Sequence, residues 1–356
     1  MQDITLQNAL EYYKSGSAGR AVCLQDRGTQ TICKNVKMLS YQDTYYSNEP
    51  NGKGQFYFED SEIHGTVDYV CGGGDVYFNR VLLVNESRKE GVKNGEDVIA
   101  APNSKSEWGY IFKDCTIENK AAAFSLGRSW NNITRLTWLN TTVNQKDEIL
   151  NDDKKFAYFT INAMGDAMAD KFRLDVLKDA EGNVFSPAEK KVIFKASDGK
   201  VLKDEENIIL TADEAAAYTL ENVFGEWEPA KLAAQQTAGA ATEVDGKLSW
   251  TGDAQMYIVL MNGEFFALTS EKSLDLEGAT GTFTVRAANE MGGFGQAGSI
   301  STGIQNLTSA IENSPAVKTA IFSVSGTQQS RLLKGINIVV KTLADGSKET
   351  TKMIVK

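Results

Sequence analysis

A four-residue pattern recurs at irregular intervals through the first 145 or so residues of the chain. Each copy begins with a large apolar residue or a cysteine, continues with two mostly polar residues, and ends with a small or apolar residue. The copies are Leu6-Gln7-Asn8-Ala9, Cys33-Lys34-Asn35-Val36, Phe58-Glu59-Asp60-Ser61, Phe78-Asn79-Arg80-Val81, Phe112-Lys113-Asp114-Cys115 and Trp138-Leu139-Asn140-Thr141. A short strand cannot bury its inward face alone, whereas stacked coils align similar residues into a continuous apolar ladder. The irregular period therefore predicts a right-handed parallel β-helix whose turns accept insertions.

The pattern also suggests where domains begin and end. We expect the β-helix over residues 1–232, with a helix at 210–218, N-capped by Thr211, closing its C-terminal end. The composition then changes to small, linker-like residues around 231–240. A small β-sandwich over 233–304 and a short C-terminal β module over 305–356 would follow, so the predicted class is all-β.

Composition excludes several kinds of function. The formal net charge is −10 and there is no run rich in lysine and arginine, which argues against a nucleic-acid partner. No stretch of about 18 uncharged apolar residues is present, so no membrane span is expected. The opening residues have no basic region followed by an apolar segment, and hence no signal peptide is predicted in this chain.

The cysteines and the single histidine are not arranged for metal or triad chemistry. The cysteines at 23, 33, 71 and 115 show no CxxC or Cys/His spacing, and we expect core thiols rather than disulfides. His64, the sole histidine, cannot complete a zinc site or a serine-histidine triad with them, and we expect it to be structural. No metal and no cofactor is therefore predicted.

Three segments resemble the pectin methylesterase (pectinesterase) family and appear in the order that this family requires. They are Tyr41-Gln42-Asp43-Thr44-Tyr45, Gly65-Thr66-Val67-Asp68-Tyr69-Val70-Cys71-Gly72 and Leu126-Gly127-Arg128-Ser129-Trp130. Each alone is weak, but three in register with a β-helical repeat make a specific signal. The similarity covers roughly residues 1–230. The resemblance implies a carboxylic ester hydrolase that removes methyl esters from homogalacturonan, the polygalacturonate of pectin.

The resemblance also assigns catalytic roles. Asp68 would be the nucleophile on the C6 carbonyl, and Asp43 would protonate departing methanol and then activate water. Gln42 would donate to the developing oxyanion, and Arg128 would keep Asp68 ionised and oriented. Two nearby carboxyl groups cannot both ionise cheaply, so we expect Asp43 to be the protonated partner.

Substrate contacts are expected from four further residues. Trp130 would stack on a sugar face, while Tyr69 and Tyr45 would add aromatic contact. Arg20, in Arg20-Ala21-Val22-Cys23-Leu24, stands where the family has a glutamine that positions substrate or oxyanion. Its charge would pair with Asp43 or Asp68, or would favour substrates with free carboxylates nearby.

The resemblance has two implications for the rest of the chain. Family members have further coils before the first motif, so we expect an N-terminally truncated member, which would also account for the missing signal peptide. The segments around 247–289 resemble a fibronectin type III-like sandwich, with Trp250 in its core and a hairpin at Asn262-Gly263. The tail is similar to C-terminal sorting modules of secreted bacterial enzymes, which implies a secreted or cell-surface protein. We expect a monomer.

Two other functions are compatible with the same fold. One is a polysaccharide lyase, which would need an acidic calcium-binding cluster and a basic catalyst. The other is a solenoid that binds pectin without turning it over, because of Arg20 or the truncation. Methanol release without an unsaturated product would separate the esterase from the lyase, and binding that survives Asp68→Asn without esterase activity in the parent would favour the non-catalytic solenoid.

Overall fold

The chain forms two compact units, Met1–Ala234 (unit 1) and Gln235–Lys356 (unit 2). The boundary falls two residues after the predicted end of the β-helix. The computed structural model describes residues 1–10, 20–87, 97–103, 106–130, 134–145, 147–164, 169–195, 201–234, 238–239, 241–289, 293–298, 316–323, 328–329, 331–343 and 348–355. Among these, no helix is long and apolar enough to span a membrane.

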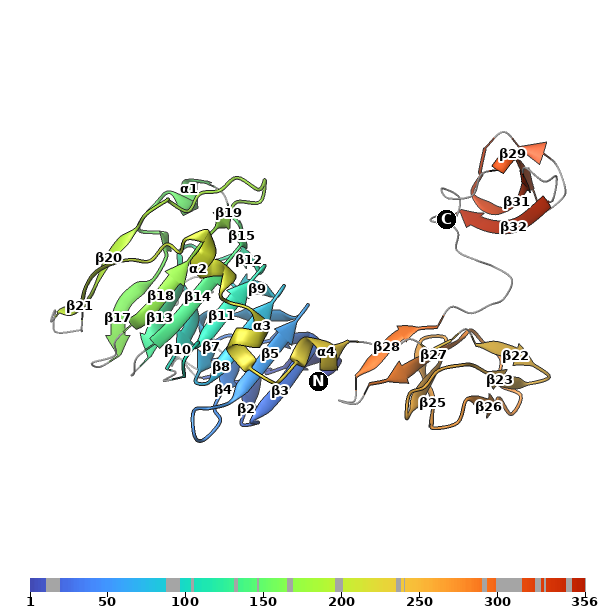
Figure 1. Ribbon diagram of the computed structural model, residues 1–356, viewed down its shortest axis with the longest axis horizontal. Coiled ribbons are helices and arrows are strands. Elements are labelled where there is room, and N and C mark those ends of the chain that lie inside the picture. The colour runs from blue at the N-terminus through green and yellow to red at the C-terminus, as the bar shows by residue number, and fades with distance from the viewer. Residues whose placement is uncertain are drawn as a thin grey trace. The chain divides into compact units, whose positions relative to one another are not determined.

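Unit 1 is a parallel β-helix whose strands lie on three faces, with the first two faces joined through β3 in one sheet (Figure 1). The first face contains β3 (Gln30–Leu39), β5 (Gln55–Glu59), β8 (Asp75–Asn79), β11 (Tyr110–Lys113), β14 (Thr134–Leu139) and β18 (Ala169–Leu174). The second contains β1 (Gln2–Gln7), the end of β3, β6 (Glu62–Gly65), β9 (Leu82–Asn85), β12 (Thr116–Asn119), β15 (Thr141–Asn144) and β19 (Leu177–Lys178). The third contains β2 (Leu24–Asp26), β4 (Tyr45–Ser47), β7 (Val67–Gly72), β10 (Asp97–Pro102), β13 (Phe124–Trp130), β16 (Phe156–Ala157) and β17 (Thr160–Met164). The predicted all-β class and parallel β-helix are confirmed.

The repeated tetrapeptides set the register of the first face. Cys33, Phe58, Phe78, Phe112 and Trp138 lie opposite one another on successive strands. All five are fully buried, and the aromatic rings stack at centroid distances of 4.9, 4.4 and 4.0 Å. Parallel pairing repeats the same position in every coil, so one apolar position becomes a continuous ladder.

The third residue of each of these five tetrapeptides makes the corner between the first and second faces. Positions 35, 60, 80, 114 and 140 all have φ between 47° and 55°. Asparagine and aspartate enter this left-handed region more easily than other non-glycine residues, because their short polar side chains can hydrogen-bond locally. The polar third position of the repeat is therefore a turn requirement, and the small or apolar fourth position is buried again.

The first predicted copy has a different register. Leu6 lies opposite Met38 on the second face, whereas the corner residue of the first coil is Asp3, with φ 53°. Asn35 donates a hydrogen bond to Asp3 at 2.8 Å, which stacks the two corners. Both segments fit the four-residue pattern. The strand pairing shows that Met1-Gln2-Asp3-Ile4, and not residues 6–9, occupies this place in the first coil.

The helices after the solenoid cover its side and do not close its end. They are α2 (Ala212–Ala216), α3 (Leu220–Phe224) and α4 (Pro229–Ala233), and Figure 1 shows them across the first face. Thr211 caps α2 in a capping box with Glu214, as predicted. Val223 and Phe224 join Tyr57 and Tyr77 in an apolar cluster over β5 and β8, so the outward side of this face is also buried. The last coils contain α1 (Asp147–Leu150) and the hairpin of β20 (Lys191–Lys195) and β21 (Val201–Asn207).

Unit 2 contains antiparallel sheets. One consists of β22 (Thr242–Val244), β23 (Lys247–Ser249) and β26 (Ser273–Asp275), and another of β25 (Glu264–Thr269), β24 (Tyr257–Met261), β27 (Phe283–Ala288) and β28 (Phe294–Ala297). These two sheets share a core with Trp250 and Tyr257, and Asn262-Gly263 makes the predicted hairpin with φ 55° and 88°. A further sheet contains β30 (Gln328–Gln329), β29 (Ala316–Ser323), β31 (Gly335–Leu343) and β32 (Lys348–Val355). The start of the predicted C-terminal module, 305–315, lies outside the described residues.

The ring ladder leads to a stability prediction. Phe78→Ala should lower the free energy of unfolding by about 3–5 kcal/mol, because it removes a fully buried ring that stacks on both neighbours. Phe265→Ala is the control, since that ring is 67% exposed, and it should cost less than about 0.5 kcal/mol. Urea denaturation of both variants measures the difference, and equal costs would contradict the ladder as a main source of stability.

Candidate active site

The third face carries four charged side chains on coils that follow one another along the solenoid. Arg20 precedes β2, Asp43 precedes β4, Asp68 lies in β7, and Arg128 lies in β13, with β10 between the last two. Ala21 N donates to Gln42 O at 2.9 Å and Asp43 N donates to Val67 O at 3.2 Å, which fixes the first three coils side by side. The order along the axis is cation, acid, acid, cation.

Both acids are held in an uncommon backbone conformation. Asp43 has φ 57° and Asp68 has φ 49°. Non-glycine residues in this region are infrequent, and the surrounding structure has to hold them there. Thr44, the next residue, donates its hydroxyl to His64 O at 2.7 Å, and Thr66 N donates to Tyr41 O at 2.8 Å, so the two corners are tied to each other.

Arg128 clamps Asp68 from two coils away. Its Nε and Nη2 donate to Oδ1 and Oδ2 at 2.8 and 2.5 Å, with side chains 22% and 7% exposed. Strand β10 lies between the two residues, and its Ala100 pairs with Gly127 of β13 and with Val70 of β7. A bidentate fork of this kind fixes both the charge and the orientation of a carboxylate. Burial raises the pKa of Asp68, and the hydrogen bonds and charge of Arg128 oppose that rise.

Asp43 has a weaker counter-ion, and its pKa is raised. Burial and the neighbouring Asp68 carboxylate raise its pKa from the usual 3.8 to about 6, while Arg20, a hydrogen bond from Gln42, and Arg128 act in the opposite direction. The Arg20 Nε lies 3.4 Å from Asp43 Oδ2. Protonating Asp68 would disrupt the two hydrogen bonds from Arg128, whereas protonating Asp43 would weaken only the 3.4 Å contact with Arg20.

The aromatic residues divide between the core and the surface. Trp130 is half-buried beside Tyr46, with ring centroids 5.9 Å apart. Sequence reasoning missed Tyr46, although side chains alternate along a strand and a core position at Tyr45 places Tyr46 on the outer side. Tyr46 and Trp130 therefore form the exposed aromatic edge near the acids.

Tyr45 and Tyr69 were expected to contact substrate, but they lie in the core, so this prediction is wrong. Tyr45 and Tyr69 are both fully buried. Tyr45 packs edge-on against Phe58 and donates to Asp26 Oδ2 at 3.5 Å, and Tyr69 donates to Asn85 Oδ1 at 2.9 Å. Their hydroxyl groups are satisfied inside the solenoid, so neither ring presents a surface to a sugar.

His64 is structural, as expected, with two acidic partners. Its Nδ1 lies 2.6 Å from Glu86, and its Nε2 contacts Glu62. Lys37 and Lys120 bind the same two carboxylates. All four cysteines are free thiols, also as expected. Within the described ranges, no group of three or more His, Cys, Asp or Glu side chains could hold a metal ion.

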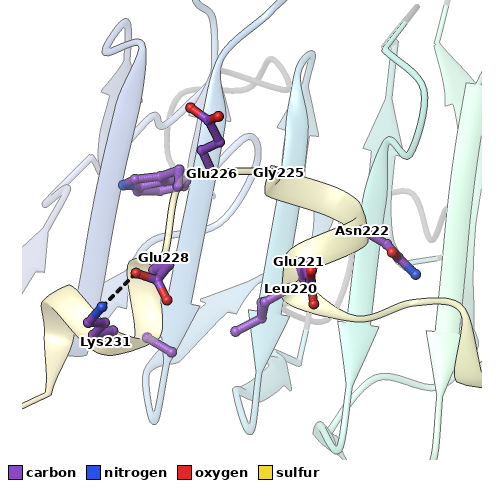
Figure 2. A pocket seen from close by; sticks show the side chains of 9 residues that line it. Leu220, Glu221, Asn222, Gly225, Glu226, Glu228 and Lys231 are labelled. Atoms are coloured by element: carbon purple, nitrogen blue, oxygen red, sulfur yellow. Dashed lines mark hydrogen bonds and ion pairs between the residues drawn. The ribbon is translucent and has the colours of Figure 1, made fainter.

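A separate hollow of about 940 Å³ lies between α3 and α4 (Figure 2). Trp227 lines it together with Glu221, Glu226 and Glu228, and Glu228 pairs with Lys231 at 2.8 Å. Glu226 points away from that pair in Figure 2. The lining carries three glutamates and one lysine, and this excess of negative charge disfavours a polyuronate ligand. None of the predicted site residues lines it.

The raised pKa of Asp43 predicts a pH-dependent stability. Because the folded protein holds this proton more tightly than the unfolded chain, the stabilisation is full below pH 3.8 and is lost as pH rises through about 6. Asp43→Asn should therefore stabilise unit 1 at pH 7.5 by about 1 kcal/mol, after allowance for solvent screening, and have little such effect at pH 4.

Urea denaturation at the two pH values measures this difference. Asp114→Asn controls for the substitution itself, because Asp114 is exposed and also has a positive φ, 54°. An equal effect of Asp43→Asn at both pH values would show that Asp43 is not a high-pKa carboxyl.

The N-terminal part of the chain is similar in sequence to known proteins. Residues 1–151 match the family model described as Pectinesterase. Pectinesterase B of Pectobacterium parmentieri is 30% identical over 154 residues, which is 38% of this chain and 37% of that protein. Probable pectinesterase 50 of Arabidopsis thaliana is 29% identical over 131 residues, covering 36% and 33%. The chain thus spans about a third of the length of these curated relatives.

Solved structures with a similar fold include two pectin methylesterases. The enzyme from Yersinia enterocolitica has a TM-score of 0.42 and 22% identity, covering 63% of this chain and 72% of that one. The enzyme from carrot has a TM-score of 0.42 and 16% identity, covering 64% and 66%. Asp43, Asp68 and Arg128 lie within residues 1–151, the segment that matches the Pectinesterase family model.

Proposed function

We propose that unit 1 is a carbohydrate esterase that removes methyl esters from the galacturonate units of pectin. The observation that carries this proposal is the pair of neighbouring carboxyl groups with opposite environments. Asp68 is clamped by a bidentate guanidinium, and Asp43 has its pKa raised to about 6. An ionised carboxylate beside a protonated one is what a nucleophile and a general acid require. The family match over residues 1–151 supports the same chemistry.

The reaction proceeds in two balanced steps. A carboxylate oxygen of Asp68 attacks the C6 carbonyl carbon, and the resulting oxyanion collapses with loss of methanol, whose oxygen takes the proton of Asp43. Asp43, now ionised, removes a proton from water as the water oxygen bonds to C6. The bond between C6 and Asp68 then breaks, which regenerates the Asp68 carboxylate while Asp43 keeps the proton taken from water. The product carboxylic acid releases its own proton to solvent and leaves as free galacturonate.

The remaining residues orient substrate and charge. Gln42 lies next to Asp43 and interacts with it through its side chain, so its amide is placed to donate to the oxyanion. Trp130, with Tyr46, offers an aromatic surface for a sugar ring. Arg20 is exposed beside Asp43 and is placed to meet the polymer. The substrate would be methyl-esterified polygalacturonate, and no cofactor takes part in this scheme.

We also propose identities for the modules of unit 2. The three-stranded and four-stranded antiparallel sheets with a shared core support a fibronectin type III-like sandwich over residues 241–298. The four-stranded sheet of β29–β32 is offered as the sorting-type module. With these modules the protein would be secreted or held at the cell surface, and would act as a monomer.

Loss of the nucleophile tests the esterase directly. The parent chain should release methanol from methyl-esterified pectin without forming an unsaturated product, and Asp68→Asn should lower this rate by at least about 10³-fold. Asp114→Asn makes the same chemical change at an exposed corner and should leave the rate within about twofold. An unsaturated product would identify a lyase. Pectin binding without methanol release, retained in Asp68→Asn, would identify a non-catalytic binding solenoid.

The geometry of the clamp gives a second test. Arg128→Lys keeps the positive charge but cannot donate two parallel hydrogen bonds to Asp68. We expect the rate of methanol release to fall by about 10²-fold, with the fold preserved in circular dichroism. A rate equal to that of the parent would show that charge alone is required and that the fork plays no part.

A further inference from the structure

The two acids of the site are held by their arginines in different ways. Arg128 engages both oxygens of Asp68 at 2.8 and 2.5 Å, and its own side chain is largely covered. Arg20 approaches a single oxygen of Asp43, Oδ2, with its Nε at 3.4 Å. The Arg20 side chain is 77% exposed, whereas that of Asp43 is 14% exposed. The contact between Arg20 and Asp43 is thus an ion pair of loose geometry, at a distance beyond that of a normal hydrogen bond.

A loose pair suits a group that changes its charge during a reaction. In the proposed esterase, Asp43 is neutral when substrate binds, becomes a carboxylate when methanol leaves, and regains a proton from water. A rigid fork would hold the charged form permanently, as it does at Asp68. A nearby guanidinium without that fork favours the charged form by a smaller amount and lets the carboxyl group return to neutrality.

We propose that Arg20 is a positioning residue that acts as the counter-ion of the general acid, stabilising the Asp43 carboxylate that forms as methanol departs. The inference rests on the proposed function and deepens it. As the C6–OCH₃ bond breaks, its electron pair goes to the methanol oxygen together with the Asp43 proton. The negative charge left on Asp43 then faces Arg20 until a water proton neutralises it.

The other groups that face Asp43 cannot take this role as readily. Asp68 has the same sign of charge, and Arg128 is already bound to Asp68. Tyr46 and Cys71 also interact electrostatically with Asp43, and both have pKa values raised by burial, so they stay neutral near pH 6. Among the residues that the structure describes, Arg20 is the cation that contacts Asp43 without also binding the nucleophile.

The role also explains why an arginine, and not a neutral amide, can stand at this position. A glutamine at 20 could donate a hydrogen bond to substrate, but it could not stabilise a new negative charge on Asp43 to the same extent. Arg20→Gln therefore separates the two roles. If Arg20 only donates to substrate, glutamine preserves the pH profile; if Arg20 is the counter-ion, glutamine moves it.

The first measurement is the pH dependence of kcat/KM for methanol release from methyl-esterified pectin. Asp43 must be protonated for the first step, so activity falls on the alkaline side as Asp43 ionises. Arg20→Gln should move this alkaline limb upward by about half to one pH unit, since removal of a cation raises the pKa of Asp43. Arg20→Lys should restore most of the parent profile, and added salt should shrink the difference.

A matched control uses the same substitution elsewhere. Arg80 pairs with Asp60 and Glu59 at a corner between the first and second faces. Arg80→Gln should leave the alkaline limb where it is. A uniform loss of activity in Arg20→Gln at every pH, without a shifted limb, would overturn the inference while leaving the esterase intact.

A second measurement needs no substrate. With aspartate labelled by ¹³C at the carboxyl carbon, the Asp43 resonance is identified by its loss in Asp43→Asn, and its titration is followed by NMR in the parent and in Arg20→Gln. We expect the Asp43 midpoint to rise in Arg20→Gln by the same half to one pH unit. An unchanged midpoint would overturn the counter-ion role. If the parent releases no methanol, the proposed function fails, and the titration still decides whether Arg20 controls the charge of Asp43.

Discussion

The structure of unit 1 depends on parallel pairing that repeats one residue position in each successive coil. On the first face this register stacks Phe58, Phe78, Phe112 and Trp138 into a ladder, and it places a left-handed corner after each of them. The corner conformation explains why aspartate and asparagine recur in the third position of the tetrapeptides. A shift of one residue in any coil would turn its inward side chains outward, so core and corners enforce the same register.

The same register builds the candidate site on the third face. Asp43 and Asp68 have left-handed backbone conformations on adjacent coils, Arg20 comes from the preceding coil, and Arg128 comes from two coils further along. Their surroundings separate the two carboxyl groups chemically. Asp68 gains two short hydrogen bonds from Arg128, while Asp43 combines burial, the charge of Asp68 and a distant guanidinium. Two identical side chains thereby have the different surroundings that the proposed nucleophile and proton donor require.

Sequence reasoning reached the class of fold because the apolar period is a direct consequence of stacked coils. It also predicted the Thr211 cap, the buried Trp250 and the free thiols, all of which depend on local chemistry. It failed where the structure depends on strand register or on which side of a sheet is covered. The first coil has its corner at Asp3, and the helices α2–α4 cover the first face because its outer side is also apolar, at Tyr57 and Tyr77.

The aromatic residues of the site also show that residue type alone does not tell on which side of a strand a side chain lies. Tyr45 and Tyr46 are adjacent and chemically identical, yet the first is core and the second borders the acids beside Trp130. Residue type cannot separate them, whereas strand alternation can once one of them is placed. The pairing of Arg128 with Asp68, 60 residues apart in the chain, came from family resemblance and not from any local pattern.

In the proposed esterase, the coils deliver Asp68, held by Arg128, as the attacking group on an ester carbonyl. The most direct measurement is to quench the protein with borohydride during turnover of a methyl-esterified oligogalacturonide and to map its peptides by mass spectrometry. Borohydride reduces an acyl-aspartate to homoserine. We therefore expect homoserine at position 68, and only when substrate is present during the quench. Homoserine at another aspartate, with Asp68 unmodified, would contradict it.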